Sequence, residues 1–355
     1  MNLEFRLRQV WTIARLELRR VFFSKRSFWV YLLALFPTVI FVGHAIDVKI
    51  QERRSAGDRA VSAALIDSIT KGDTADEITA RLGPPARDFE WKSGRRGERG
   101  RRHMVYSDGK RRADLDFEAN ILASKHVHTF VDFDESRTIF AGVFDYFYLR
   151  LAIFFGCLGI FMNLFRGEML DKTLHFWFLA PARREVLLAG KYLAGLVAAV
   201  IIFGGGAMLA FAAMLWPHDP AEIKAYLQGP GLGHAISYAG AAALGCLGYG
   251  SVFLASGLLL RNPIIPAVVL LLWEGINGFL PEILQKLSVI YYVQALCPVP
   301  PPTDPNMPAL LKLLISPPTP PSVWLAVLGL LGVTALVLWA ASRAVKRLEI
   351  NYGTD

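Results

Sequence analysis

Long apolar stretches separated by charged blocks dominate the pattern of this chain. A helix rises about 1.5 Å per residue, so about 20 apolar residues are needed to cross roughly 30 Å of hydrocarbon. The first apolar stretch is longer than the core of a signal peptide and follows a charged helix, so we expect it to be retained. The pattern predicts six membrane-spanning helices, at 28–46, 144–165, 187–216, 236–260, 264–281 and 323–342.

Residues 1–27 show helical spacing before the first span. Apolar residues recur three and four positions apart from Leu7 to Phe22, and most arginines fall between them. This pattern predicts an amphipathic cytoplasmic helix in the plane of the lipid headgroups. A solvated charged segment is the alternative. The residues expected at the membrane interface are Trp11, Arg15, Arg19 and Arg20.

The segment 47–143 carries the signals of an inserted small α/β domain. Thr74 and Glu77 form the sequence of a capping box, and Gly83 ends the short helix that it starts. Ala63 to Ile66 is predicted to be a strand, Asp108-Gly109 a hairpin turn, and Val127 to Phe133 another strand. Between these signals, Arg95 to Arg102 is arginine-rich and is expected to form a mobile loop, with contact to anionic lipid or substrate as an alternative.

The segment 282–322 contains an apolar run and then a proline-rich stretch. Leu287 to Cys297 is eleven residues long, which is too short to span a bilayer as a helix. We expect a re-entrant or interfacial helix there, followed by a stiff proline-rich connection. The complete expectation is a membrane α-helical fold with six spans, an N-terminal interfacial helix and an inserted α/β domain.

The distribution of Lys and Arg predicts the orientation of the spans. The segments 1–27, 166–185, 261 and 343–355 together hold fifteen such residues, whereas 217–235 and 282–322 hold three. Because positive side chains resist translocation, both termini and the segment 166–186 are expected in the cytoplasm. The segment 47–143 holds eighteen Lys and Arg residues, but long domains translocate largely regardless of charge, so we expect this segment to be extracytoplasmic.

The net charge of +8 changes this picture little, because positive charge beside spans is topogenic and does not imply a nucleic-acid partner. The sequence contains no G-x-x-x-x-G-K-[ST] loop, so it encodes no such site for ATP. It also lacks G-x-S-x-G, H-E-x-x-H and metal-ligand spacing among its cysteines and histidines. We therefore expect neither catalysis nor a bound cofactor or metal in this chain.

Ionisable residues inside predicted spans are costly and mark possible function. Arg150 lies near the start of the second span, where it can snorkel outward or pair with Asp145. Glu274 lies in the fifth span on the same helix as Asn277. Glu274 can line a translocation path, contribute to a subunit interface or anchor the helix at its external boundary.

The cytoplasmic segment Arg166 to Lys191 is too elaborate for a simple turn. It combines an acidic start, an apolar patch from Phe176 to Leu179 and a stop made of proline and arginines. Such a segment can present a protruding surface to a cytoplasmic partner.

At these positions the sequence resembles the permeases of type 2 ATP-binding-cassette (ABC-2) transporters. The matching pattern is a glutamate after the second span, a Thr-Leu pair, an apolar stretch, a proline, arginines and a lysine that opens the next span. Span count, orientation, the first helix and the loop between spans one and two also resemble that family. The residues that carry the resemblance, and the coupling contacts that it implies, are Glu168, Lys172, Thr173, Leu174, Pro181, Arg183, Arg184 and Lys191.

The resemblance implies a permease in a bacterial inner membrane. Two permeases, as a homodimer or a heterodimer, would form an export pathway and contact membrane lipids. Two separate ATPase subunits would bind ATP and Mg in the cytoplasm, and the segment 166–186 would be the coupling segment that they contact. The competing hypothesis is a membrane-anchored assembly or sensory protein whose external domain binds a ligand or partner.

Overall fold

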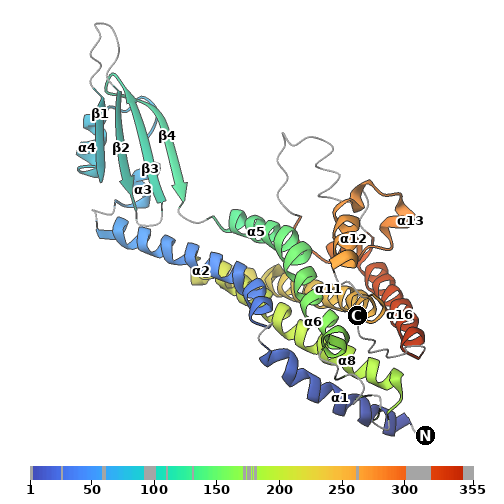
Figure 1. The fold of residues 1–355 in the computed structure, drawn as a ribbon. Coiled ribbons are helices and arrows are strands. Elements are labelled where there is room, and N and C mark those ends of the chain that lie inside the picture. The colour runs from blue at the N-terminus through green and yellow to red at the C-terminus, as the bar shows by residue number, and fades with distance from the viewer. Residues whose placement is uncertain are drawn as a thin grey trace. The chain divides into compact units, whose positions relative to one another are not determined.

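The structure is a computed structural model, and it divides into two compact units (Figure 1). The helical unit comprises Met1–Ile40, Arg137–Ala213 and Pro220–Asp355, and the sheet unit comprises Phe41–Ser136 and Met214–Asp219. The residues that the structure describes are 3–24, 27–57, 61–91, 101–108, 111–129, 132–170, 173, 177, 179, 182–260, 264–300 and 321–346.

Helices account for most of the described chain outside the sheet unit. In chain order they are α1 (Leu3–Phe23), α2 (Ser27–Gly57), α5 (Phe133–Gly142), η1 (Val143–Ala152), α6 (Ile153–Leu170), α8 (Arg184–Ala199), η2 (Val200–Gly204), α9 (Gly205–Leu215), α10 (Pro220–Tyr226), η3 (Leu227–Gly231), α11 (Leu232–Leu259), α12 (Ile264–Gly275), η4 (Asn277–Phe279), α13 (Glu282–Gln285), α14 (Val289–Gln294) and α16 (Val323–Lys346). Helix α11 packs against α6, α8, α14 and α16, and α1 packs along α8.

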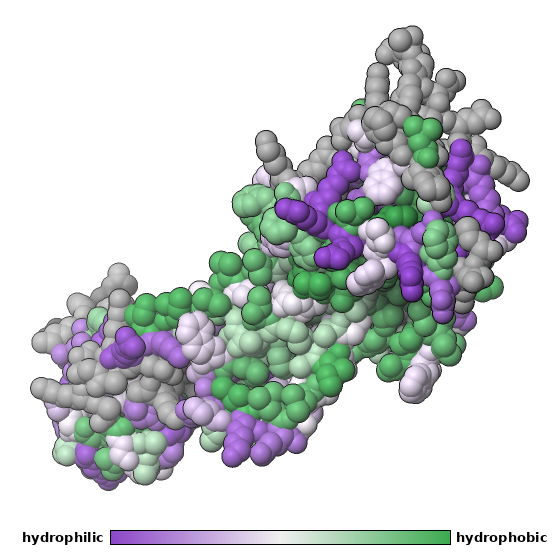
Figure 2. Space-filling model, turned by 90° about the horizontal axis from the view of Figure 1, so that it is seen from below, coloured by the Kyte–Doolittle hydropathy of each residue, from purple (hydrophilic) through white to green (hydrophobic). Residues whose placement is uncertain are grey.

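Five helices in the described part of the chain are long and apolar enough to cross a membrane. Figure 2 shows hydrophobic residues over much of the visible surface, as expected where helices face lipid. On α16, for example, Trp324 and Leu336 are exposed by 79% and 66%. The five helices are Ser27–Gln51, Phe133–Leu170, Arg184–Leu215, Pro220–Leu259 and Val323–Lys346.

Two of these helices begin more than ten residues before the spans predicted from the sequence. The helix of the second span starts at Phe133, because Asp132 Oδ1 accepts the N–H groups of Asp134 and Glu135 at 2.8 and 3.2 Å. Ahead of the fourth span a helical stretch begins at Pro220, where the missing N–H costs little, and the chain kinks at Gly229 (φ −94°, ψ −124°) before α11. The stretch 217–235 is therefore largely helical rather than a loop.

The predicted fifth span, 264–281, is not one continuous helix. Helix α12 has 12 residues, which cover about 18 Å, and it ends at Gly275. The sequence from Gly275 to Pro281 is rich in poor helix formers, and the chain continues through η4 and α13. A sixth span therefore stays a prediction. A short helix does lie within Leu287 to Cys297, as predicted, whereas the prolines from Pro301 onward lie outside the described residues.

The sheet unit contains one antiparallel sheet with the strand order β1-β2-β3-β4. Its strands are β1 (Arg87–Trp91), β2 (Arg101–Ser107), β3 (Arg111–Glu118) and β4 (Ile121–Thr129), accompanied by α3 (Ala63–Asp67) and α4 (Ala75–Leu82). The core forms between the two short helices and one face of the sheet. It consists of Val61, Ile66, Ile69, Ala75, Ile78, Met104, Tyr106, Ala113, Leu115, Phe117 and Leu122.

Most local signals in this unit predicted the structure correctly. The capping box of Thr74 and Glu77 is present, and Gly83 ends α4 with a φ of +83°. Strands β2 and β3 pair on either side of the predicted turn at Asp108, although Gly109 lies outside the described residues. The strand predicted for Ala63 to Ile66 is wrong, because these residues form helix α3 with the buried Ile66 facing the core.

The face of the sheet opposite this core carries charged pairs. His103 Nδ1 lies 2.7 Å from Asp116 Oδ1, and Ser124 Oγ donates to Asp116 Oδ2 at 2.8 Å. These hydrogen bonds stabilise the carboxylate, so the pKa of Asp116 is lowered. Of the predicted mobile loop Arg95 to Arg102, the residues before Arg101 lie outside the described residues. Arg102 is instead part of β2 and binds both oxygens of Asp88, at 3.0 and 2.7 Å.

Glycine allows α6 and α11 to pack closely in the helical unit. A Cβ atom on Gly250 would lie 2.5 Å from Phe161 Cζ, whereas one on Gly240 of the same helix would lie 3.9 Å from the nearest atom, in Leu296. The sequence prediction that small residues mark helix contacts thus holds at Gly250.

We predict that Gly250→Ala destabilises the protein by about 1–3 kcal/mol because it overpacks the contact with Phe161. Gly240→Ala is the matched control, since it makes the same change where there is room. Thermal unfolding of both variants in detergent measures the difference. Equal melting temperatures for the two variants would contradict the close α6–α11 packing.

Candidate functional site

Four charged side chains from three helices meet inside the helical unit. We call them the charge cluster: Glu17 and Arg20 of α1, Glu168 of α6 and Lys191 of α8. Lys191 Nζ lies 2.6 Å from Glu17 Oε1 and 2.9 Å from Glu168 Oε1. Arg20 Nη1 donates to the same oxygen of Glu168 at 2.8 Å. Two acids and two bases balance, so the ionised cluster has no net charge.

Burial makes the charge cluster energetically decisive. Lys191, Glu168 and Glu17 are exposed by 0%, 1% and 2%. Removing one member of a buried ion pair leaves an uncompensated charge and costs about 3–5 kcal/mol. The cluster therefore specifies how α1, α6 and α8 fit together.

Local sequence explains why these side chains converge. Ile13, Glu17 and Arg20 are spaced by four and three residues, so they share one face of α1. A Cβ atom on Gly190 would lie 2.7 Å from Ile13 Cγ2, so the glycine lets α1 approach α8 closely. Lys191, the next residue, then reaches the acids.

Trp177 adds a contact from the predicted coupling segment. Its Nε1 donates to Glu168 Oε1 at 3.0 Å. Lys191 Nζ lies 5.1 Å from the centroid of the Trp177 ring and 5.5 Å from that of Phe165, which are cation–π distances. Glu168 Oε1 thus receives three donors, whereas Oε2 has no hydrogen-bond partner within the described residues.

The structure separates the predicted coupling residues. Glu168 and Lys191 are brought together, but they are buried rather than displayed for a partner. Thr173 donates its N–H to Glu168 O at 2.9 Å and closes the end of α6. Lys172, Leu174 and Pro181 lie outside the described residues.

The two arginines of the segment differ in their contacts. Arg184 Nη1 donates to the carbonyls of Val345 and Lys346 at 3.3 and 3.2 Å, so it binds the C-terminal end of α16. The neighbouring Glu185 forms an ion pair with Lys346. Arg183 is exposed at the N-terminal boundary of α8, so it is the better placed of the two to contact another molecule.

The predicted interfacial residues lie on helix α1, and all four of them are exposed. Trp11 is 65% exposed, and Arg15 and Arg19 are also exposed, while Arg20 reaches Glu168. Sequence reasoning missed Glu17. Its signal was an acid placed four residues after Ile13 on the apolar stripe of a basic helix.

The predicted intramembrane residues form two separate contacts. Arg150 Nε lies 3.6 Å from Asp145 Oδ2, which is one of the pairings considered from the sequence, and Gln294 Nε2 donates to Asp145 Oδ1 at 2.8 Å. Glu274 is buried and accepts hydrogen bonds from Ser288 Oγ and from the N–H groups of Val289 and Ile290 at 3.0 and 3.2 Å.

The bonds of Glu274 place its carboxylate at the N-terminus of α14, where a negative charge is favoured. Asn277 is also buried, and its backbone oxygen accepts the Leu280 N–H at 3.1 Å. This geometry favours the anchoring role among the three roles considered for Glu274.

An open cavity of about 500 Å³ lies between α6 and α12, and we call it the apolar groove. Among the described residues, the polar side chains that line it are those of Asn163 and Arg166. Its other lining residues are Phe155, Leu158, Gly159, Met162, Leu170, Ala267, Val268 and Leu271. On α6 they follow the helical spacing of three and four, so they form one stripe that leads to Arg166.

These features define a multi-pass membrane protein with a buried ionic junction beside a segment that connects two of its spans. The sequence model of a family described as ABC-2 family transporter protein matches residues 11–260. The chain therefore belongs to the ABC-2 transporter family and is a membrane transport subunit. A search of curated proteins gives no match.

We predict that Lys191→Met destabilises the protein by about 3–5 kcal/mol, because it leaves Glu17 and Glu168 as adjacent buried acids. Adding Glu17→Gln should restore part of this loss, since Arg20 and Glu168 then remain as a balanced pair. Lys224→Met, at an exposed site on α10, serves as the control. Unfolding measurements that give additive effects for the two cluster substitutions would refute the ionic junction.

Proposed function

We propose that this chain is the permease subunit of an ABC-2 exporter. It forms the translocation pathway and couples it to ATP hydrolysis by a separate cytoplasmic ATPase. Membership of the ABC-2 family supports the transport role. The observation that carries the coupling role is the hydrogen bond from Trp177 to Glu168, because it joins the segment between two spans to the charge cluster.

ATP and Mg are assigned to the partner subunit, because this sequence contains no Walker-type phosphate loop. We propose a complex of two ATPase subunits and two permeases, with the second permease either a copy of this chain or a related one. Membership of the family supports an ATPase partner, and the exposed apolar faces of α2 and α16 leave surface for a second permease or for lipid.

Coupling follows from how the charge cluster is built. A displacement of the segment 166–186 by an ATPase would pull on Trp177 and on the end of α6. Because Glu168 also binds Arg20 and Lys191, α1 and α8 must move with α6 or leave charge buried without a partner. The charge cluster would thus make α1, α6 and α8 move together when the ATPase displaces the segment 166–186.

The apolar groove is the best candidate for part of the pathway in this chain. Its stripe on α6 runs through Arg166 to Leu170, on either side of Glu168 of the charge cluster in sequence. Movement of α6 would therefore change the groove directly. The apolar lining favours a cargo with an apolar portion.

A membrane-anchored assembly or sensory protein is the second candidate. The observation in its favour is that the sheet unit is compact and has a hydrophobic core of its own. Such a unit can bind a ligand or partner while the helices serve as an anchor. Association with an ATPase separates the two proposals.

The coupling proposal predicts the effect of Arg183→Glu. Arg183 is exposed, so the variant should fold and insert like the wild type but lose most of the ATPase stimulation that the permease confers. The measurement is ATP hydrolysis by the complex of the chain with the ATPase that co-purifies with it. Lys224→Glu, on α10, is the matched control.

Glu168 is a poorer site for this test, because charge reversal in the buried cluster would also disrupt folding. Full stimulation in Arg183→Glu would remove that residue from the docking surface. Failure of any ATPase to co-purify with the wild-type chain would favour the anchor or sensor.

The proposed location is a bacterial inner membrane with both termini in the cytoplasm. We predict that a membrane-impermeant maleimide labels Gly100→Cys in intact cells but labels Thr12→Cys, on α1, only after lysis. Cys297→Ser is the background, since Cys157 and Cys246 are buried. Labelling of position 12 in intact cells would reverse the orientation.

A further inference from the structure

The apolar groove holds a positive charge that no described residue neutralises. Arg166 lines the groove and is half-buried, and its guanidinium has no hydrogen bond, ion pair or ring contact within the described residues. The described lining of the groove also contains no acid. Glu168 lies on nearly the opposite face of α6, because successive residues of a helix turn by about 100°. Its charge is balanced by Lys191 and Arg20 in the charge cluster.

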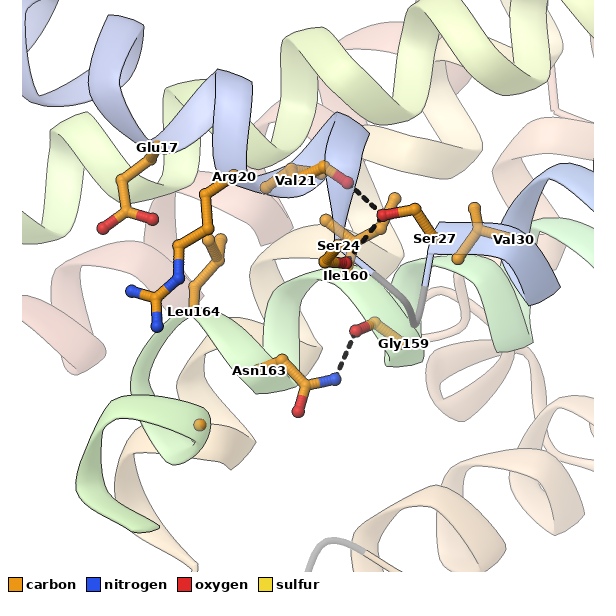
Figure 3. A pocket seen from close by; sticks show the side chains of 11 residues that line it. Glu17, Arg20, Val21, Ser24, Ser27, Val30, Gly159, Ile160, Asn163 and Leu164 are labelled. Carbon is orange, nitrogen blue, oxygen red and sulfur yellow. Dashed lines mark hydrogen bonds between the residues drawn. The ribbon is translucent and has the colours of Figure 1, made fainter. Parts of the chain in front are cut away.

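The other polar side chain of the groove is already engaged. Asn163 Nδ2 donates to Gly159 O at 2.5 Å, as a dashed line in Figure 3 shows. These two residues also line the smaller cavity drawn in Figure 3, between α1, α2 and α6, but the arginine of that cavity, Arg20, is paired with Glu168. Among the described lining residues of the two cavities, Arg166 is therefore the cation that is left for a ligand.

The groove has the dimensions of one apolar chain. On α6 its lining from Phe155 to Arg166 rises by about 16 Å, because a helix rises about 1.5 Å per residue. That length is close to half of the roughly 30 Å hydrocarbon core, so it matches one acyl chain in a bilayer leaflet. Ala267, Val268 and Leu271 of α12 form the other wall. The volume of about 500 Å³ lies in the range of pockets that hold one small organic molecule.

We propose that the apolar groove binds an amphiphile with one apolar chain and an anionic group, and that this is the chemical class of the cargo. The chain lies along the stripe on α6 and against α12, and Arg166 binds the anionic group. A guanidinium suits phosphate or carboxylate, because its N–H donors form a planar fork that matches their oxygens. An uncharged lipid would leave the arginine without a partner. The cargo assignment rests on the proposed exporter function, whereas binding in the groove can be measured on the chain alone.

The position of Arg166 joins recognition of this ligand to coupling. Arg166 is two residues from Glu168 on the same helix, so a movement of α6 that the charge cluster transmits also moves the arginine that holds the anion. Binding of the anion and displacement of the segment 166–186 would then act on the same end of α6.

Photolabelling of the full chain in phosphatidylcholine nanodiscs tests the binding step. The probe is dodecyl phosphate with a diazirine in its chain, and the matched uncharged probe is the corresponding alcohol at equal incorporation. We expect the phosphate to label the α6 and α12 peptides that line the groove at least about tenfold more than the alcohol, because charge-assisted hydrogen bonds are strong. Arg166→Gln should remove that preference, whereas Arg166→Lys should keep part of it. Arg343→Gln removes a positive charge at the end of α16, where Arg343 lies over the Trp339 ring, and should leave labelling unchanged.

Val268→Trp tests the apolar wall. Val268 lines the groove and is 48% exposed, so the larger ring should fill the groove and remove most of the labelling by the phosphate probe. Leu272→Trp is the matched control, because Leu272 is 61% exposed on the same helix but does not line the groove. Thermal unfolding confirms that each variant is folded.

Three results would overturn the binding inference. They are equal labelling by the two probes in the wild type, equal effects of the two tryptophan variants, and unchanged preference in Arg166→Gln. Displacement of the probe by equimolar phosphatidylglycerol would show a general site for anionic bilayer lipid and would overturn the cargo assignment.

The tryptophan variants also separate the cargo assignment from the exporter proposal. In the complex with the co-purifying ATPase, unlabelled dodecyl phosphate should raise ATP hydrolysis with the wild type and with Leu272→Trp but not with Val268→Trp. Labelling without this stimulation would overturn the cargo assignment. Absence of labelling in a chain that still binds an ATPase would overturn the groove inference alone, whereas labelling in a chain that binds no ATPase would contradict the exporter proposal alone.

Discussion

The pairing of buried charge is the constraint on which the helical unit depends. Glu168 and Lys191 are almost completely inaccessible, and burying either charge without the opposite charges of the cluster would carry a large desolvation cost. Apolar contacts between helices tolerate small sliding movements, whereas ionic contacts at 2.6–2.9 Å do not. The cluster therefore makes α1 an integral part of the bundle, even though much of that helix is exposed.

The sequence allowed the broad architecture to be predicted because its signals are local. Span-length apolar runs, the capping box at Thr74 and the hairpin at Asp108 each depend on residues close together in the chain. The strand prediction for residues 63–66 was wrong for the same reason, because it also relied on local signals alone. A short apolar run fits a strand or a buried helix equally well, and only packing of Ile66 against the distant sheet decides between them.

The candidate site was only partly predictable. Family resemblance pointed to Glu168 and Lys191, but as surface contacts, because a charge in a cytoplasmic segment is normally solvated. Their burial depends on Glu17, which lies more than 150 residues away in sequence, and on the close approach that Gly190 permits. Arg184 similarly binds α16, a contact that no local pattern indicates. Long-range partners are what a single sequence leaves undetermined.

The bond between Glu274 and the start of α14 has a mechanical consequence. If α14 moved away from α12, the Glu274 carboxylate would lose its three hydrogen-bond donors inside the protein. Exposure of an acid to hydrocarbon costs roughly 3 kcal/mol, which corresponds to an open population about a hundredfold smaller. Helices α12 and α14 should therefore move together. A movement of α12, which lines the apolar groove, would then be transmitted through α14 to the helices that α14 contacts.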